Sequence, residues 1–106
     1  MTSINENKLE IIKNTCRELF PACRILLFGS RAREDHSERS DYDFLVITKN
    51  TLDIQRKRFY KSLLRKRLAK FKIPADVLIQ SESEIVVKEK IPGHIVRQIL
   101  KEGVAI

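Results

Sequence analysis

Two aspartates, separated by one residue, stand at the start of an apolar segment. Asp41 and Asp43 flank Tyr42 and lead into the run YDFLVI at residues 42–47, a pattern typical of a β-strand. Because strand side chains alternate between two faces, both carboxylates are predicted to lie on one face. A divalent cation relieves the repulsion within such a pair, and oxygen ligands suit Mg²⁺. The simpler interpretation is a solvated pair of acids at a strand start.

A third acid opens another apolar segment. Asp76 lies at the head of ADVLIQ, residues 75–80, which also predicts a strand. If the two strands are neighbours, Asp76 joins Asp41 and Asp43. Three carboxylates around two metal ions about 4 Å apart form the clamp used in phosphoryl and nucleotidyl transfer. Taken by itself, Asp76 favours the simpler interpretation, an exposed acid at a strand end.

A glycine–serine turn follows the first predicted strand, RILLF at residues 24–28. Gly29 allows the backbone to come close to a ligand, and the start of a short helix capped by Ser30 offers free N–H groups to an anion. The Ser30 hydroxyl can donate to a phosphate oxygen, and Arg31 and Arg33 add positive charge. A glycine–serine pair alone is a weak signal, because most such pairs are ordinary turns.

Together these segments carry a family pattern. The stretch GSRAREDHSERSDYD contains Gly-Ser, then ten residues, then Asp-x-Asp. In this the chain resembles the DNA polymerase β-like nucleotidyltransferase superfamily. Within it, the chain is most similar to the minimal nucleotidyltransferases of prokaryotes, which include the MntA-type antitoxins. The resemblance runs over almost the whole chain, including the ending HIVRQILKEGVAI.

The resemblance implies a reaction and a set of roles. Gly29 and Ser30, with the neighbouring Arg31 and Arg33, would hold the triphosphate of ATP or another nucleotide. The acceptor oxygen would attack the α-phosphate, and pyrophosphate would leave. Many members of the family resemble antitoxins encoded beside a HEPN-domain RNase toxin and adenylylate a tyrosine of that toxin. The resemblance therefore implies AMP transfer to a HEPN toxin, as in a type VII-like toxin–antitoxin pair.

The same resemblance implies the metal ligands. Asp41 and Asp43 would bind two Mg²⁺ ions, while Asp76 would share a metal and help to deprotonate the acceptor hydroxyl. One position departs from the family pattern, because Glu34 stands where these proteins commonly have a glycine. Glycine there would allow a left-handed turn, which glutamate resists. This departure bears on the efficiency of nucleotide binding and not on the three acids.

The remaining pattern predicts the elements that position these residues. Apolar spacing and breakers indicate a small α/β (α+β) fold, a mixed β-sheet flanked by helices, in a single domain over residues 1–106. Thr51 is expected to cap the long helix, Ser81 and Glu84 have capping-box spacing, and Pro92 and Gly103 should bound the last helix. Besides the strands above, the elements expected are helices over residues 4–20, 52–71, 82–90 and 92–102, and an edge strand or docked end at 104–106.

The long predicted helix is strongly basic. Nine Lys or Arg fall within residues 55–72, and no acid lies between Asp53 and Asp76. Three interpretations remain open: a solvated face, a docking surface for an acidic partner, or contact with nucleic-acid phosphates. The helical spacing of Phe59 and Phe71 predicts packing in the core rather than stacking on bases.

Composition sets the remaining limits. The net charge of the 106 residues is +7, which attracts anions. No apolar run approaches the roughly 20 residues of a membrane span, and the start lacks a secretory-signal layout, so a cytoplasmic location is expected. Cys16 and Cys23 should be reduced thiols, and the isolated His36 and His94 are not expected to bind metal. Two alternatives to the enzyme remain: a non-catalytic antitoxin that acts by docking, and a nucleic-acid-binding module.

Overall fold

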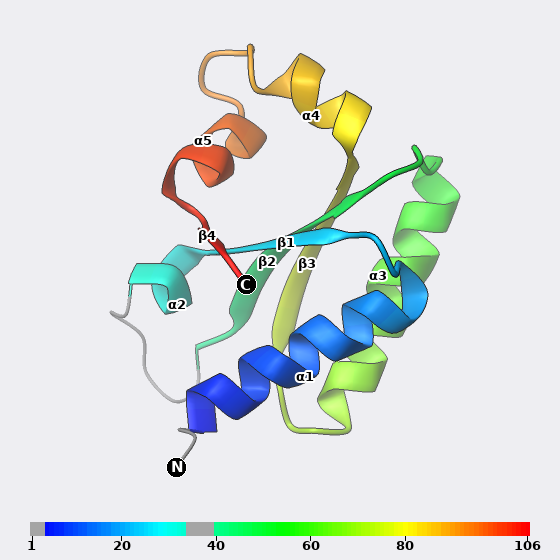
Figure 1. The fold of residues 1–106 in the computed structure, drawn as a ribbon, viewed down its shortest axis with the longest axis vertical. Coiled ribbons are helices and arrows are strands. Elements are labelled where there is room, and N and C mark those ends of the chain that lie inside the picture. Colours follow the sequence, from blue (N-terminus) through cyan, green and yellow to red (C-terminus); the bar gives the residue numbers. More distant parts are fainter. Residues whose placement is uncertain (1–3, 34–39) are drawn as a thin grey trace.

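A four-stranded mixed sheet, in the order β3-β2-β1-β4, organises the chain. The computed structural model describes residues 4–33 and 40–106, and Figure 1 shows their arrangement. Strand β2 is antiparallel to β1 and parallel to β3, and β4 is antiparallel to β1. The predicted mixed sheet flanked by helices is confirmed. The elements are α1 (Ile4–Leu19), β1 (Arg24–Phe28), α2 (Gly29–Arg33), β2 (Tyr42–Thr48), α3 (Ile54–Ala69), β3 (Ala75–Ser81), α4 (Glu82–Lys88), α5 (Ile95–Glu102) and β4 (Val104–Ala105).

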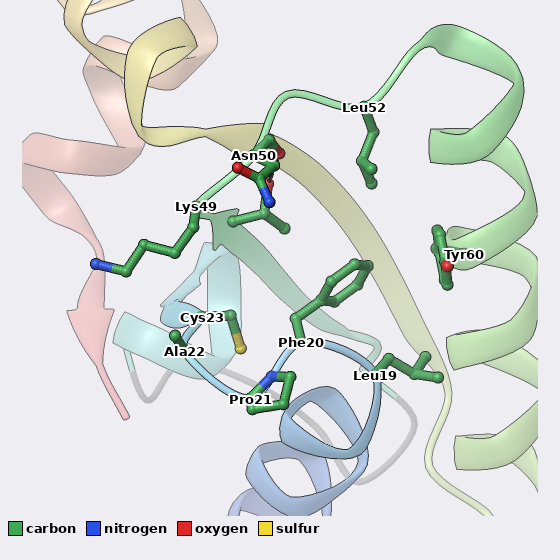
Figure 2. Close-up of a pocket in the computed structure, with 10 residues that line it drawn as sticks. Leu19, Phe20, Pro21, Ala22, Cys23, Lys49, Asn50, Leu52 and Tyr60 are labelled. Atoms are coloured by element: carbon green, nitrogen blue, oxygen red, sulfur yellow. Dashed lines mark hydrogen bonds between the residues drawn. The ribbon is translucent and has the colours of Figure 1, made fainter.

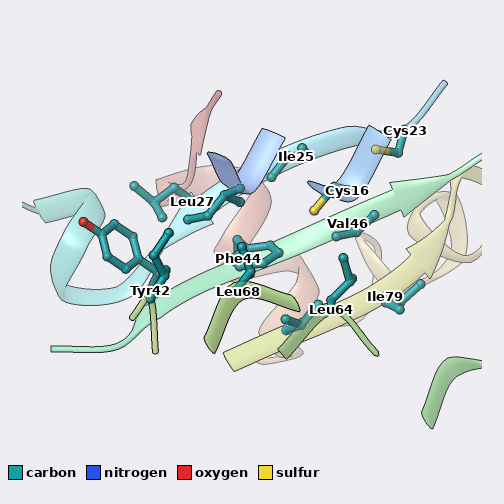
Figure 3. Close-up of a cluster of buried hydrophobic side chains, with 13 residues drawn as sticks. Cys16, Cys23, Ile25, Leu27, Tyr42, Phe44, Val46, Leu64, Leu68 and Ile79 are labelled. Atoms are coloured by element: carbon teal, nitrogen blue, oxygen red, sulfur yellow. The ribbon is translucent and has the colours of Figure 1, made fainter. Parts of the chain in front are cut away.

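The two faces of the sheet are covered by different helices. Phe44 and Val46 of β2 point to the face covered by α1 and α3, where they pack with Leu64 and Leu68 (Figure 3). The alternate residues of β2, among them Leu45, pack on the opposite face against α4 and α5. A strand buried on both faces needs apolar residues at nearly every position. This requirement explains the continuous apolar run that follows Asp43.

The long helix α3 begins later than the sequence suggested. Its N-cap is Asp53, whose Oδ1 accepts a hydrogen bond from the Arg56 backbone N–H at 2.7 Å. The predicted cap, Thr51, is therefore wrong. The Thr51 hydroxyl lies 2.7 Å from the Ser81 hydroxyl instead. Aspartate and threonine are both favourable N-cap residues, so residue type alone does not decide between Thr51 and Asp53. The position at which the chain turns from β2 into the helix decides it.

The predicted burial of two phenylalanines is also wrong. Phe59 is 62% exposed and Phe71 is 56% exposed. The buried stripe of α3 runs through Leu64 and Leu68, and one turn earlier it is Tyr60, with its ring centroid 4.8 Å from that of Phe20, that continues the stripe. Phe71 lies beyond the last residue of α3, so helical spacing does not govern its direction.

The C-terminal elements agree with the sequence in part. The capping box of α4 is present, since the Ser81 hydroxyl accepts from the Glu84 N–H and the Glu84 carboxylate accepts from the Ser81 N–H. Pro92 does not begin α5. The N-cap is His94, whose Nδ1 accepts from the Val96 N–H at 3.1 Å, so this histidine has a capping role. Gly103 ends α5 as predicted, and β4 adds the predicted edge strand beside β1.

Two further expectations concern thiols and membranes. Cys16 and Cys23 are both buried and free. Burial raises the pKa of the Cys16 thiol to about 12, and the neighbouring Cys23 adds to the effect. No helix in the described parts of the chain is long and apolar enough to cross a membrane.

Candidate active site

Asp43 and Asp76 occupy paired positions on adjacent parallel strands. They are direct partners in the β2–β3 register. Tyr42, Phe44 and Val77, their neighbours in sequence, pack on the face covered by α1 and α3, so the alternation of strand side chains directs both carboxylates to the opposite face. The structure thus brings Asp76 beside Asp43, as the sequence predicted. Asp41 immediately precedes β2 and is exposed.

Gly29 packs directly against the Asp43 carboxylate. Phe28, the last residue of β1, is paired with Asp43 across the antiparallel β1–β2 ladder. At Gly29 the chain leaves the strand with φ 72°, a left-handed conformation that favours glycine. A Cβ atom built on Gly29 would collide with Asp43 Oδ2. Glycine is therefore favoured at this position for two reasons: the backbone is left-handed, and the Asp43 carboxylate occupies the space that a Cβ atom would need.

The turn itself differs from the prediction in one respect. Helix α2 begins at Gly29, so Ser30 lies inside the helix and does not cap it. Ser30 is half-buried next to the glycine, and Arg33 is the last residue of α2. Glu34, which departs from the family pattern, and His36 lie outside the described residues.

The acids influence one another electrostatically. Partial burial raises the pKa of the Asp43 carboxyl above its usual value, and the negative charges of Asp76 and Asp41 raise it further. A carboxylate whose ionised form is opposed by two neighbouring acids is stabilised by a cation. The donor set, three carboxylates, has the chemistry that Mg²⁺ prefers. Within residues 4–33 and 40–106, however, no three Asp, Glu, His or Cys side chains stand close enough to form a ready-made metal cluster.

Arg31 is directed toward the chain that leads into these acids. It is 7% exposed, and its Nε and Nη2 atoms donate to the Ser40 carbonyl at 3.2 Å and 2.9 Å. The guanidinium carbon also lies 4.3 Å from the centroid of the Tyr42 ring. The sequence suggested Arg31 as a nucleotide contact, and these contacts give its guanidinium a positioning role that the sequence did not reveal. In the sequence, a basic residue shortly after a Gly-Ser turn is equally compatible with contacting the nucleotide and with positioning a neighbouring segment.

Two cavities help to delimit the site. One of about 150 Å³ lies beside the turn and is lined by Phe28, Gly29 and residues of α5, among them Ile95 and Ile99. Another of about 340 Å³ lies near the opposite end of β2, between Phe20 and Tyr60 (Figure 2). No predicted site residue lines the second cavity. The candidate chemistry therefore belongs to the end of the sheet where β1 finishes and β2 and β3 begin.

Comparison with known proteins identifies the family of the chain. The family model described as nucleotidyltransferase domain matches residues 9–106. Two candidate protein adenylyltransferases of Methanocaldococcus jannaschii are similar to the chain. One is 32% identical over 76% of the chain and 73% of its own length, and the other is 30% identical over 78% of the chain and 77% of its own length.

Solved structures share the fold. A toxin–antitoxin crystal structure with AMP-PNP gives a TM-score of 0.62 at 24% identity, over 93% of this chain and 71% of that one. The complex of a tri-AMPylated Shewanella oneidensis HEPN toxin with its MNT antitoxin gives 0.54 at 23% identity, over 93% and 67%. A Sulfolobus solfataricus protein described as a nucleotidyltransferase gives 0.54 at 22% identity, over 93% and 76%. By its family match and its relatives, the chain belongs to the nucleotidyltransferase domain family and is a nucleotidyltransferase.

Proposed function

We propose that this nucleotidyltransferase moves AMP from ATP to a hydroxyl of a partner protein, a tyrosine of a HEPN-domain toxin, and thereby acts as an antitoxin. The observation that carries the proposal is the convergence of Gly29, Asp43 and Asp76 at one end of the sheet. Two relatives named as candidate protein adenylyltransferases and a similar fold in an antitoxin bound to an AMPylated toxin support it.

The residues at this end of the sheet have different roles in the proposed reaction. Gly29 and Ser30 place the triphosphate next to Asp43, since the missing side chain at Gly29 leaves room for the Asp43 carboxylate to lie against the turn. Asp41, Asp43 and Asp76 would hold Mg²⁺, which would neutralise charge on the phosphates. Asp76 accepts the proton of the acceptor hydroxyl. The new bond joins the acceptor oxygen to the α-phosphorus, the bond from that phosphorus to the bridging oxygen breaks, and pyrophosphate departs.

Mass spectrometry tests the transfer. The full chain is incubated with ATP, MgCl₂ and a HEPN-domain protein, and this partner should gain the mass of one or more AMP groups on tyrosine. Asp43→Asn and Asp76→Asn should abolish the gain. Glu89→Gln is the matched control, because Glu89 is an exposed carboxylate on the chain segment after α4. Equal labelling by Asp43→Asn and wild type would contradict the assignment.

The docking alternative makes a different prediction. An antitoxin that acts only by stoichiometric binding would neutralise its toxin equally well as the Asp43→Asn variant and without ATP. Growth rescue by that variant, compared with rescue by wild type at equal protein level, separates the two. Rescue that requires Asp43 supports the enzyme.

A further inference from the structure

The end of α3 and the starts of β2 and β3 enclose a basic hollow beside the candidate active site. A cavity of about 400 Å³ is lined by Asp41, Arg65 and Lys72, over a floor that includes Ile73 and Pro74. A second cavity of about 370 Å³ shares Arg65 with the first and adds Ser62 and Lys66. The two cavities share Arg65 and Ala69 and are here called the basic groove, defined by Asp41, Ser62, Arg65, Lys66 and Lys72.

The three cations of the basic groove make no ion pair within the described chain. Some cations of α3 have acidic partners: Lys57 Nζ lies 2.6 Å from Glu84 Oε2, and Arg67 Nη1 lies 3.2 Å from Glu18 Oε2. Arg65, Lys66 and Lys72 take part in no ion pair among residues 4–33 and 40–106. Within the basic run, Lys57 and Arg67 therefore connect α3 to other helices, whereas Arg65, Lys66 and Lys72 line the groove without an acidic partner.

Lys72 stands in a conformation that glycine would adopt more easily. Its φ is 58°, and it is the one non-glycine residue with positive φ in the described chain. It closes the end of α3, where its N–H donates to the Ala69 carbonyl at 3.0 Å, a position at which glycine is commonest. A residue other than glycine in this conformation is strained, and such strain is often found at residues with a functional role. Lys72 shares the 400 Å³ cavity with Asp41.

The order of the strands indicates which substrate approaches from this side. In an in-line displacement the attacking and leaving oxygens lie on opposite sides of the phosphorus. Gly29, at the end of β1, lies on one side of Asp43, while β3 lies on the other, and the groove reaches the start of β3 at Pro74 and Ala75. With the triphosphate at Gly29 and Ser30, the acceptor enters from the side of the basic groove.

We propose that the basic groove binds an acidic segment of the acceptor protein and guides its tyrosine to the active site; this rests on the proposed transfer to a protein. Unpaired cations around an apolar floor complement carboxylates on an extended peptide. Single-stranded nucleic acid is bound through stacking on aromatic side chains as well as charge, and no aromatic residue lines either cavity of the groove. The lining of the groove therefore favours a peptide over a nucleic acid.

Fluorescence anisotropy tests the groove without any nucleotide present. The probes are short labelled peptides with one tyrosine, flanked by Asp and Glu in one and by Ser and Gly in the other. The acidic peptide should bind wild type at least about tenfold more tightly than the neutral one, and Arg65→Glu with Lys72→Glu should remove this preference. Equal binding of the two peptides by wild type overturns the proposal.

A matched control and a competing probe sharpen the result. Arg58→Glu with Lys90→Glu makes the same change in net charge at two exposed residues outside the groove, and this variant should keep the preference for the acidic peptide. If both double variants lose the preference for the acidic peptide equally, the preference depends only on the net charge of the protein, and the proposal is overturned. The proposal is also overturned if a labelled single-stranded oligonucleotide binds wild type more tightly than the acidic peptide does and loses this binding in the Arg65→Glu, Lys72→Glu variant. That result would make the groove a nucleic-acid site.

Lys72→Gly separates binding from structure. Because glycine relieves the positive φ, the unfolding midpoint should rise, while acidic-peptide binding should weaken severalfold. A raised midpoint with unchanged binding overturns the role of Lys72.

Transfer assays with the HEPN partner distinguish failure of the groove proposal from failure of the proposed function. Normal transfer by the Arg65→Glu, Lys72→Glu variant overturns the groove alone, whereas absence of transfer by wild type with acidic preference retained overturns the proposed function alone.

Discussion

The α-carbon of Gly29 and the carboxylate of Asp43 occupy adjoining space at the end of the β1–β2 ladder, so closely that a methyl group on Gly29 would strike Asp43 Oδ2. This contact joins the two halves of the sequence motif. The turn is not merely near the acids. Its glycine forms one wall of the space in which the Asp43 carboxylate lies.

Replacing this glycine should therefore affect both stability and catalysis. Gly29→Ala adds a Cβ at φ 72°, and should lower the free energy of unfolding by about 1–3 kcal/mol from backbone strain and the displaced carboxylate. AMP transfer should fall at least about tenfold. Chemical denaturation and a transfer assay measure the two effects.

Gly93→Ala provides the control. Gly93 also has positive φ, 78°, but a Cβ there meets nothing within 4 Å. This variant should show the backbone cost alone, with transfer unchanged. If the two alanine variants lose stability and activity equally, the contact between Gly29 and Asp43 has no specific effect.

Removing charge from the acid cluster should stabilise the metal-free protein. Burial and the charges of Asp76 and Asp41 oppose ionisation of Asp43, so Asp43→Asn should raise the free energy of unfolding in EDTA, by less than about 1 kcal/mol because the group is partly solvated. MgCl₂ should raise the unfolding midpoint of wild type but not of the variant. An identical response of both proteins to MgCl₂ would show that Asp43 does not bind the ion.

Arg31 should be needed to hold the segment that leads into the acids. Arg31→Met removes two hydrogen bonds to the Ser40 carbonyl and the contact with the Tyr42 ring, and should cost about 2–3 kcal/mol of stability. Arg31→Lys should recover part of the stability, because an ammonium cannot reproduce two donors in a fixed plane. If Arg31 acts only on the nucleotide, both variants will keep wild-type stability and raise KM for ATP.

Acid should weaken the link between α3 and α4. Burial alone raises the pKa of the Glu84 carboxyl, but hydrogen bonds from Lys57 and Ser81 outweigh it and hold this pKa below the usual 4.5. A depressed folded-state pKa contributes stability above the unfolded value, and this contribution is lost as the pH falls through the folded value. The loss should therefore appear below about pH 4.5.

Glu84→Gln tests this pH dependence. Glutamine preserves the capping box but not the ion pair with Lys57, so the variant should lose about 1 kcal/mol at neutral pH and converge with wild type in acid. Denaturation series between neutral and acidic pH measure the difference. Glu89→Gln, at an exposed position, should show the same dependence of unfolding free energy on pH as wild type. If Glu84→Gln remains less stable than wild type by the same amount at every pH, the prediction is contradicted.

The buried thiols should resist modification. Since burial and Cys23 raise the pKa of Cys16 to about 12, iodoacetamide at mildly alkaline pH should leave Cys16 unlabelled in the native chain and label it rapidly in urea. Peptide mapping of the labelled protein provides the measurement. Rapid native labelling would show that α1 opens readily from the sheet.

The sequence alone determined the strands, the capping box at Ser81 and the Gly29–Asp43 motif, because each depends on local spacing and chemistry. The tertiary structure decided matters that depend on neighbours distant in sequence. It set the register that pairs Asp43 with Asp76, turned Tyr60 rather than Phe59 toward the core, and directed Arg31 to Ser40. It also gave Lys57 and Arg67 acidic partners on other helices and placed Arg65 and Lys66 in the basic groove. Periodicity gives the direction of a side chain relative to its own element, whereas its partner is fixed only when the elements pack.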